Sequence, residues 1–332
     1  MAEKKVPLKQ LEMGKAFEYA CLVALYDHHS PNQDVRIVED DSYKIAKGYF
    51  EKAGYKQKDF MDGAKAAVRV LNRLEPRLTY PGGASPLFLS LQPDNAGKKG
   101  DVRDVLCIRK GNEWEIGLSC KHNHEDLKHS RLSKKLDFGK KWMEIPCSET
   151  YFEEIKVVFD ELITLREANN NERKSNPVKF EDFTDVEDRF YYPVMKAFIK
   201  ELKRIDSDNE GVPQKFAHYM MGQNDFYKVI TNDRKRLTKI QAVNIDGTLS
   251  KPSEGHKGTP TISKIKLPTE FVRIRMVKDS KNTAEIICDN SWTFTLRIHN
   301  ASKKIESSLK FAVGLKGEPV GFYSEMEPWD KE

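Results

Sequence analysis

The sequence contains no apolar run that approaches the ~20 residues a helix needs to cross a bilayer. Its first ten residues, MAEKKVPLKQ, are charged and lack the apolar core of a secretory signal peptide. Cysteine is scarce, and the five that occur form an odd number without regular spacing, which argues against a disulfide framework. We therefore expect a protein of the reducing cytoplasm without a membrane partner, in which the cysteines serve as small buried hydrophobic residues.

Neither sign of charge dominates, because 56 lysines and arginines stand against 51 acidic residues and leave a net charge of +5. This excess permits an anionic partner without requiring one, since basic side chains can gather locally on one surface. The 332 residues are enough for a sizeable core and two subdomains. Residues 169–177 are polar and end in proline, which predicts a boundary that separates residues 1–170 from residues 171–332.

Hydrophobic periodicity predicts an α/β chain with a β-rich C-terminal region. Ser42 is the candidate N-cap of the second helix. Helices are expected over residues 11–26, 42–52, 58–74, 148–168, 185–205 and 214–221. Strands are expected over residues 87–91, 237–245, 270–277, 283–288, 292–299 and 309–315.

Two β-rich runs flank a turn at residues 110–113, and this pattern predicts an antiparallel hairpin. If the turn centres on its glycine and asparagine, Asp104 falls opposite Ser119. Side chains alternate along a strand, so Glu115, Ser119 and Lys121 share one face, and Asp104 lies on the same face in this register. The hairpin would thereby gather two carboxylates and one ammonium group in a small patch.

A pair of carboxylates beside a lysine suits the metal-assisted hydrolysis of a phosphodiester. Carboxylate oxygens hold Mg²⁺, which keeps some of its waters and takes its remaining ligands from phosphate. The metal lowers the pKa of a bound water, and a lysine can orient that water or stabilise the developing charge. Asp104 and Lys121 are therefore candidate catalytic residues. The alternative is an ordinary solvated hairpin end, because charged side chains are common on protein surfaces.

Asp104, the hairpin and the tripeptide Ser119-Cys120-Lys121 resemble the PD-(D/E)xK nuclease signature. More specifically, the segments GDVRDVL, IGLSCKHNHEDLKHSRLS and DFGKKW resemble the HaeIII-type family of type II restriction endonucleases. The resemblance runs over most of the chain and is strongest over residues 97–142. It implies a mixed sheet flanked by helices, Mg²⁺ as the cofactor and double-stranded DNA as the partner. It also implies cleavage at the short palindrome GGCC and a matching methyltransferase that protects the host DNA.

One position departs from the family signature, because the acidic residue expected two places before Lys121 is Ser119. Serine is a poor Mg²⁺ ligand, so the second carboxylate has to come from elsewhere, and the candidates are Glu115, Asp101 and Glu18. Glu18 lies at or near the apolar stripe of the first predicted helix, where an unpaired carboxylate is costly, so it should have a partner. That partner is either a cation at the edge of the stripe or, as the resemblance to the family's first helix implies, a metal ion at the hairpin.

Candidate contacts with DNA phosphates lie on both sides of the hairpin. Lys98 and Lys99 stand between two glycines just before it, where the backbone can approach a phosphate and the lysines can neutralise it. An ordinary solvated loop is the alternative for this segment. His124, Lys128 and Arg131 follow the hairpin, at the start of a helix that is expected from about residue 125.

The β-rich C-terminal region supplies the candidates for base recognition. Arg297 and His299 are two residues apart on one predicted strand face, and Asn300 stands at its end. Arginine can contact guanine O6 and N7 with two hydrogen bonds, and the major groove admits a two-stranded β-ribbon. The segment also resembles a C-terminal block of several restriction enzymes. A polar strand face without a role in recognition is the alternative.

These patterns predict a type II restriction endonuclease that makes Mg²⁺-dependent double-strand cuts. A homodimer would match a palindromic site, because two-fold sites are often met by two-fold dimers, and a monomer that cuts each strand in turn is the alternative. Two other functions are compatible with the sequence: a DNA-binding protein that does not cleave, and a PD-(D/E)xK repair nuclease that acts on branched or damaged DNA. Incubation with plasmid and Mg²⁺ separates these functions.

Overall fold

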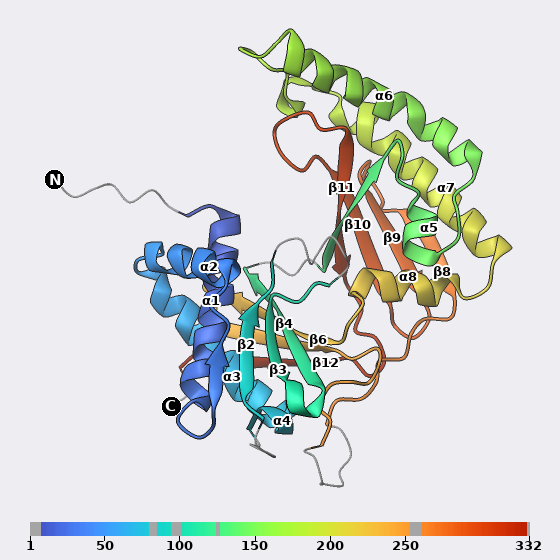
Figure 1. The fold of residues 1–332 in the computed structure, drawn as a ribbon. Coiled ribbons are helices and arrows are strands. Elements are labelled where there is room, and N and C mark those ends of the chain that lie inside the picture. The colour runs from blue at the N-terminus through green and yellow to red at the C-terminus, as the bar shows by residue number, and fades with distance from the viewer. Residues whose placement is uncertain (1–7, 80–84, 94–100, 124–126, 253–260, 331–332) are drawn as a thin grey trace. The chain divides into compact units, whose positions relative to one another are not determined.

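The computed structural model describes residues 8–79, 85–93, 101–123, 127–252 and 261–330, without the side chains of residues 112, 128 and 129. The chain forms two compact units, and each is discontinuous in sequence (Figure 1). The first consists of Met1–Glu125, Gly222–Ile265 and Gly321–Glu332, and the second of Asp126–Met221 and Lys266–Val320. The boundary predicted at residue 170 lies within the second of these units, where residues 169–171 are the last residues of a helix (Glu149–Asn171).

A mixed sheet forms the centre of the first unit, and its seven strands in the described ranges have the order β1-β2-β3-β4-β6-β7-β12. β1 pairs in parallel with β2, and β4 pairs in parallel with β6, while the other neighbours are antiparallel. The strands are β1 (Val35–Ile37), β2 (Leu87–Leu91), β3 (Val105–Arg109), β4 (Trp114–His122), β6 (Phe226–Asn232), β7 (Leu237–Val243) and β12 (Tyr323–Pro328).

Helices of the N-terminal segment lie beside this sheet (Figure 1): α1 (Gln10–His29), α2 (Asp41–Lys52), α3 (Lys56–Leu74) and α4 (Pro76–Thr79). Phe17 and Cys21 of α1 are buried, as their helical spacing predicted. The N-cap of α2 is Asp40, whose carboxylate accepts a hydrogen bond from the N–H of Tyr43 at 3.0 Å, and the expectation of Ser42 is wrong. No helix in the described part of the chain is long and apolar enough to span a bilayer.

The second unit contains an antiparallel sheet of five described strands in the order β5-β11-β10-β9-β8. The strands are β5 (Lys128–Ser133), β8 (Phe271–Met276), β9 (Thr283–Cys288), β10 (Thr293–His299) and β11 (Ser308–Leu315). The expected helix from about residue 125 is wrong, because β5 pairs with β11. Ser130 and Leu132 are buried whereas Arg131 between them is exposed, and this period of two belongs to a strand.

Helices close one face of this sheet: α5 (Phe138–Met143), α6 (Glu149–Asn171), α7 (Tyr192–Asp208) and α8 (Val212–Met221), with a π-helical turn (Glu187–Tyr191) before α7. Aromatic rings join them to the strands. The ring centroid of Phe198 in α7 lies 5.1 Å from that of Phe311 in β11, and Phe216 in α8 lies 5.4 Å from Phe294 in β10. All four rings are fully buried, so they form the core of the second unit.

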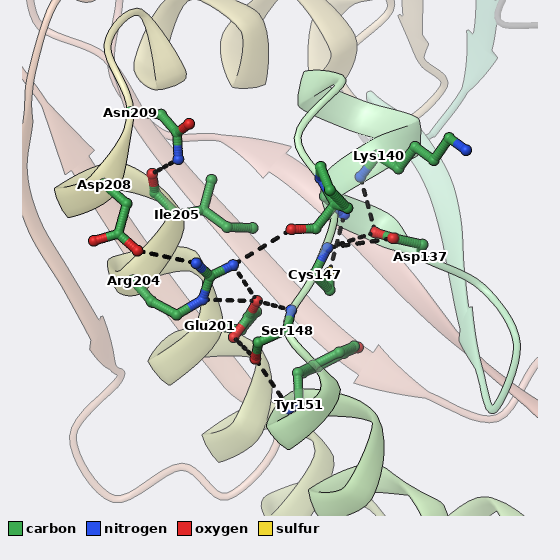
Figure 2. A network of polar contacts seen from close by, with 12 residues as sticks. Asp137, Lys140, Cys147, Ser148, Tyr151, Glu201, Arg204, Ile205, Asp208 and Asn209 are labelled. Atoms are coloured by element: carbon green, nitrogen blue, oxygen red, sulfur yellow. Dashed lines mark hydrogen bonds and ion pairs between the residues drawn. The ribbon is translucent and has the colours of Figure 1, made fainter.

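A buried carboxylate, Glu201 of α7, joins that helix to the start of α6 (Figure 2). It accepts hydrogen bonds from the N–H of Ser148 at 2.6 Å and from the Ser148 hydroxyl at 2.8 Å, and Arg204 forms an ion pair with it at 2.8 Å. Burial opposes its ionisation, but these donors hold the pKa of Glu201 below its ordinary value. Ser148 also caps α6 through the N–H of Tyr151, so this network is an anchor within the second unit.

The cysteines are free thiols: Cys21, Cys107, Cys120 and Cys288 are buried, and Cys147 is partly buried. Their predicted use as small hydrophobic residues is confirmed for these four buried positions. The fold is thus a mixed α/β arrangement with a mixed sheet, flanking helices and a β-rich C-terminal region, as the sequence predicted at this level.

Candidate active site

The predicted hairpin is confirmed as strands β3 and β4, which pair in antiparallel register. The N–H of Asp104 donates to the carbonyl of Leu118 at 2.6 Å, so the pairing continues to Asp104, which lies opposite Ser119 as expected. The turn between the strands is a short 3-10 segment, Lys110–Asn112. This register brings Asp104 and Lys121 to the same end of the hairpin.

The Asp104 carboxylate meets two donors from β4. Its Oδ2 accepts a hydrogen bond from the N–H of Cys120 at 2.7 Å and lies 3.5 Å from Nζ of Lys121. Burial disfavours the charged form of Lys121, but nearby groups, of which Asp104 contributes most, more than offset this, so the pKa of Lys121 lies above its ordinary value. Lys121 is therefore an ammonium ion at neutral pH.

Glu18 brings a second carboxylate to this place from helix α1. The residue is buried, and its Oε2 lies 2.9 Å from Nζ of Lys15, one turn earlier on the helix. Burial, followed by the charge of Asp104, raises the pKa of Glu18 to about 8, although the charges of Lys15 and Lys121 act in the opposite direction. The partner that Glu18 was expected to have is thus Lys15, and the carboxylates of Glu18 and Asp104 lie close enough to repel each other.

One arginine binds the two other carboxylate candidates. Nε and Nη2 of Arg103 donate to the two oxygens of Asp101 at 2.8 Å and 2.7 Å, and its Nη1 lies 2.6 Å from Glu115. The aliphatic part of Arg103 covers Gly117, where a Cβ would lie 2.2 Å from Cδ of the arginine. Glycine therefore permits this position of Arg103, which pairs with both acids within the protein.

A cluster that the sequence did not reveal holds the end of β4 next to Lys121. Nε2 of the buried His122 lies 2.9 Å from the carboxylate of Asp233, and Nζ of Lys56 lies 3.0 Å from the same carboxylate. The amide nitrogen of Asn123 donates to Asp233 at 3.2 Å. Because Lys56 and Asp233 are 177 residues apart, only the folded chain brings them together. The ion pair between Lys15 and Glu18, by contrast, could have been predicted from the sequence, because residues three apart on a helix lie on the same face.

The residues expected to contact phosphates have different surroundings. Lys98, Lys99 and His124 lie outside the described residues, as does the side chain of Lys128, whose backbone begins β5. Arg131 is exposed on β5 and forms an ion pair with Glu306 at 2.6 Å.

The three candidates for base recognition lie on and next to β10. Arg297 is exposed, and Nδ1 of His299 lies 2.6 Å from the carbonyl oxygen of Asn300. The amide of Asn300 accepts a hydrogen bond from the hydroxyl of the buried Tyr191 at 2.8 Å and donates to the carbonyl of Ser302. The Asn300 side chain is therefore engaged within the protein, whereas Arg297 points to solvent.

A family model described as HaeIII restriction endonuclease matches residues 14–319, a range that contains Glu18, Asp104 and Lys121. The chain belongs to the HaeIII restriction endonuclease family. One relative, the type II restriction enzyme HaeIII of Haemophilus aegyptius, is 38% identical over 325 residues, which are 97% of this chain and 99% of that enzyme. No solved structure matches the chain.

Membership of the HaeIII family makes this protein a type II restriction endonuclease, a site-specific deoxyribonuclease whose substrate is DNA. The predicted enzyme class is confirmed at this level. Enzymes of this class generally use a divalent metal ion. In this chain two acidic side chains, Asp104 and Glu18, lie near Lys121 at the end of the β3–β4 hairpin.

Proposed function

We propose that this enzyme cuts both strands of DNA at GGCC with Mg²⁺ as its cofactor, on a PD-(D/E)xK core built from β3, β4 and α1. The observation that carries the proposal is the convergence of Asp104, Lys121 and Glu18 from two strands and a helix. GGCC is the site implied by the resemblance to HaeIII-type enzymes. Glu18 takes the place of the acidic residue that the signature lacks at Ser119.

The side chains present fit Mg²⁺. This ion takes hard oxygen ligands and is usually bound through one or two carboxylates, with waters and substrate phosphate completing its shell. The described residues contain no group of three or more His, Cys, Asp and Glu side chains that could hold a metal ion, whereas a structural zinc site needs four such ligands. Burial is the main cause of the raised pKa of Glu18, and the negative charge of Asp104 raises this pKa further. A divalent cation would supply positive charge to this pair of acids.

Asp104 and Glu18 would hold the ion, which when bound stabilises charge on the phosphate and lowers the pKa of a coordinated water. Lys121 remains an ammonium ion beside Asp104, where it orients the attacking water and stabilises the developing charge. The N–H of Cys120 fixes the orientation of the Asp104 carboxylate. The contact between His122 and Asp233 holds the backbone that follows Lys121.

Replacement of the two proposed metal ligands tests this assignment. Asp104→Asn and Glu18→Gln are expected to lower the rate of plasmid cleavage in Mg²⁺ by orders of magnitude, because each removes a charged ligand. Affinity for a GGCC duplex, measured with Ca²⁺ in place of Mg²⁺, should change much less. Glu115→Gln is the matched control and should cut normally, because the Glu115 carboxylate is already engaged in an ion pair with Arg103.

Two results would contradict the assignment. Cleavage at the wild-type rate by Asp104→Asn would remove the proposed site altogether. Normal cleavage by Glu18→Gln together with inactivity of Glu115→Gln would make Glu115 the second carboxylate.

A further inference from the structure

The five-stranded sheet of the second unit has one face closed by helices, and the register of its strands defines the opposite face. Arg297 and His299 alternate with the buried residues of β10, so they lie on this opposite face. Ala312 of β11 stands across from Arg297, and Lys310 stands across from His299. Arg131 of β5 stands across from Lys310. We call this surface the open face.

The open face continues across β9 and β8. Thr295 of β10 stands across from Glu285 of β9, which in turn stands across from Arg275 of β8. Arg273 stands across from Ile287, two residues further along the same pair of strands and therefore on the same face. Both arginines of β8 are exposed. The open face therefore extends over the whole width of the described sheet.

Positive charge dominates the open face. Among the described residues its strands carry one acid, Glu285, and five cations: Arg131, Arg273, Arg275, Arg297 and Lys310. Glu285 pairs with Arg275 at 2.8 Å, and Glu306 from a neighbouring loop pairs with Arg131 at 2.6 Å. Arg273 and Arg297 form no ion pair with any described residue. The balance of charge suits a polyanion, and duplex DNA carries one phosphate charge per ~1.7 Å of its axis.

We propose that the open face is the surface on which this enzyme binds its DNA duplex. The inference rests on the proposed function and extends it to named residues of the second unit, which does not contain Asp104, Lys121 or Glu18. Its centre is lined by small side chains, since Ala312 and Gly314 of β11 stand across from Arg297 and Thr295 of β10. Small residues at the centre let a duplex approach the backbone of the sheet closely.

The width of the sheet, compared with that of the major groove, indicates which residues can contact bases and which can contact phosphates. Neighbouring strands lie ~4.8 Å apart, so five strands span about 19 Å, whereas the major groove is about 12 Å wide and ~8.5 Å deep. The sheet as a whole cannot enter the groove, but a long side chain from its central strand can. Arg297 on β10 is placed to contact guanine O6 and N7, and Arg273 on the edge strand β8 is placed to contact phosphates.

Binding measurements on single variants test these two assignments. Affinity is measured by fluorescence anisotropy with Ca²⁺ in place of Mg²⁺, on one duplex with GGCC and one with GCGC. Arg297→Gln is expected to lose about tenfold to a hundredfold in affinity for GGCC and little for GCGC, because a bidentate contact with guanine is lost. Arg273→Gln is expected to weaken both complexes equally and to reduce the slope of log K against log salt by about one.

Two further variants separate a local effect from a general effect of charge or folding. Arg173→Gln removes the same charge from an exposed position after α6 in the same unit, and it should bind like the wild type. Glu285→Gln removes the acid from the open face and should tighten binding to both duplexes a few-fold, which a misfolded variant would not do.

The outcomes distinguish this inference from the proposed function. If the open-face variants bind and discriminate like the wild type while Asp104→Asn has lost cleavage, the open face is not the DNA surface and the proposed chemistry stands. If the open-face variants lose binding but the wild type fails to cut in Mg²⁺, the surface stands and the proposed chemistry is wrong. Equal losses in Arg173→Gln and Arg273→Gln would also overturn the inference.

Discussion

Replacing Glu75 by glutamine is expected to stabilise this enzyme above neutral pH. Glu75 is the C-cap of α3 and is fully buried. Its Oε1 accepts hydrogen bonds from the Tyr227 hydroxyl at 2.7 Å and from the N–H of Ser250 at 2.6 Å, whereas its Oε2 has no hydrogen-bond partner among the described residues. Burial raises the pKa of Glu75 to about 7, although these two hydrogen bonds act in the opposite direction.

The direction of the pH effect follows from proton binding. The unfolded chain releases the Glu75 proton near pH 4.5 and the folded chain near pH 7, so the folded state binds more protons between these values and the free energy of unfolding falls as pH rises. At roughly 1.4 kcal/mol per pH unit, the full interval corresponds to about 3 kcal/mol. About 2 kcal/mol of this loss develops between pH 5 and pH 8.

Urea unfolding at pH 5 and pH 8 measures the effect. Glutamine keeps an oxygen for the two donors and carries no charge. Glu75→Gln should therefore exceed the free energy of unfolding of the wild type by about 1 kcal/mol at pH 5 and by about 3 kcal/mol at pH 8. A difference between variant and wild type that is the same at both pH values would refute this reasoning, because Glu75 would then not titrate in this range.

Asp225→Asn is the control, because this buried carboxylate is fully engaged. One of its oxygens accepts a hydrogen bond from the N–H of Ile245 at 2.6 Å, and the other accepts two from Thr248 at 2.8 Å each. An amide nitrogen in either place would face another donor. Asp225→Asn should therefore lower the free energy of unfolding at both pH values, in contrast to Glu75→Gln.

Three further predictions concern catalysis and packing. Lys121→Ala should lower the cleavage rate by orders of magnitude with a modest effect on binding, and loss of binding with normal cutting of the bound fraction would make the lysine a phosphate contact instead. Gly139→Ala should lower the free energy of unfolding by about 1–3 kcal/mol, because an added Cβ would lie 2.4 Å from the carbonyl oxygen of Ile145. Gly48→Ala within α2 meets no atom within 4 Å and should leave stability unchanged or raise it by up to about 1 kcal/mol in the same urea assay.

Features set by neighbours in sequence were predictable. The strands at residues 87–91 and 283–288 have the predicted ends. The first was predicted from a short apolar run, and in both strands buried residues alternate with partly buried ones. The hairpin placed Asp104 opposite Ser119 because a short turn fixes the register of its two strands. Glu18 was noticed because a carboxylate next to an apolar helical stripe is unusual. These local rules are enough to bring Asp104 and Lys121 together.

Features set by distant partners were not predictable from the sequence. β5 was expected to be a helix, and its identity as a strand depends on pairing with β11, which lies some 180 residues later. Arg103 could not be recognised as the partner of Asp101 and Glu115, because a glycine in the neighbouring strand creates the space for it. β12 has a polar sequence and was missed, since its place at the edge of the sheet leaves most of it partly exposed.

The polypeptide passes between its two units four times, at residues 125–126, 221–222, 265–266 and 320–321. The acidic pair and the lysine all come from the first 121 residues, yet the sheet that carries them receives its last strand, β12, only at Tyr323–Pro328. A ribosome must therefore release nearly the whole polypeptide before the first unit can complete its fold. We expect a translation product interrupted before that strand to leave the host chromosome uncut.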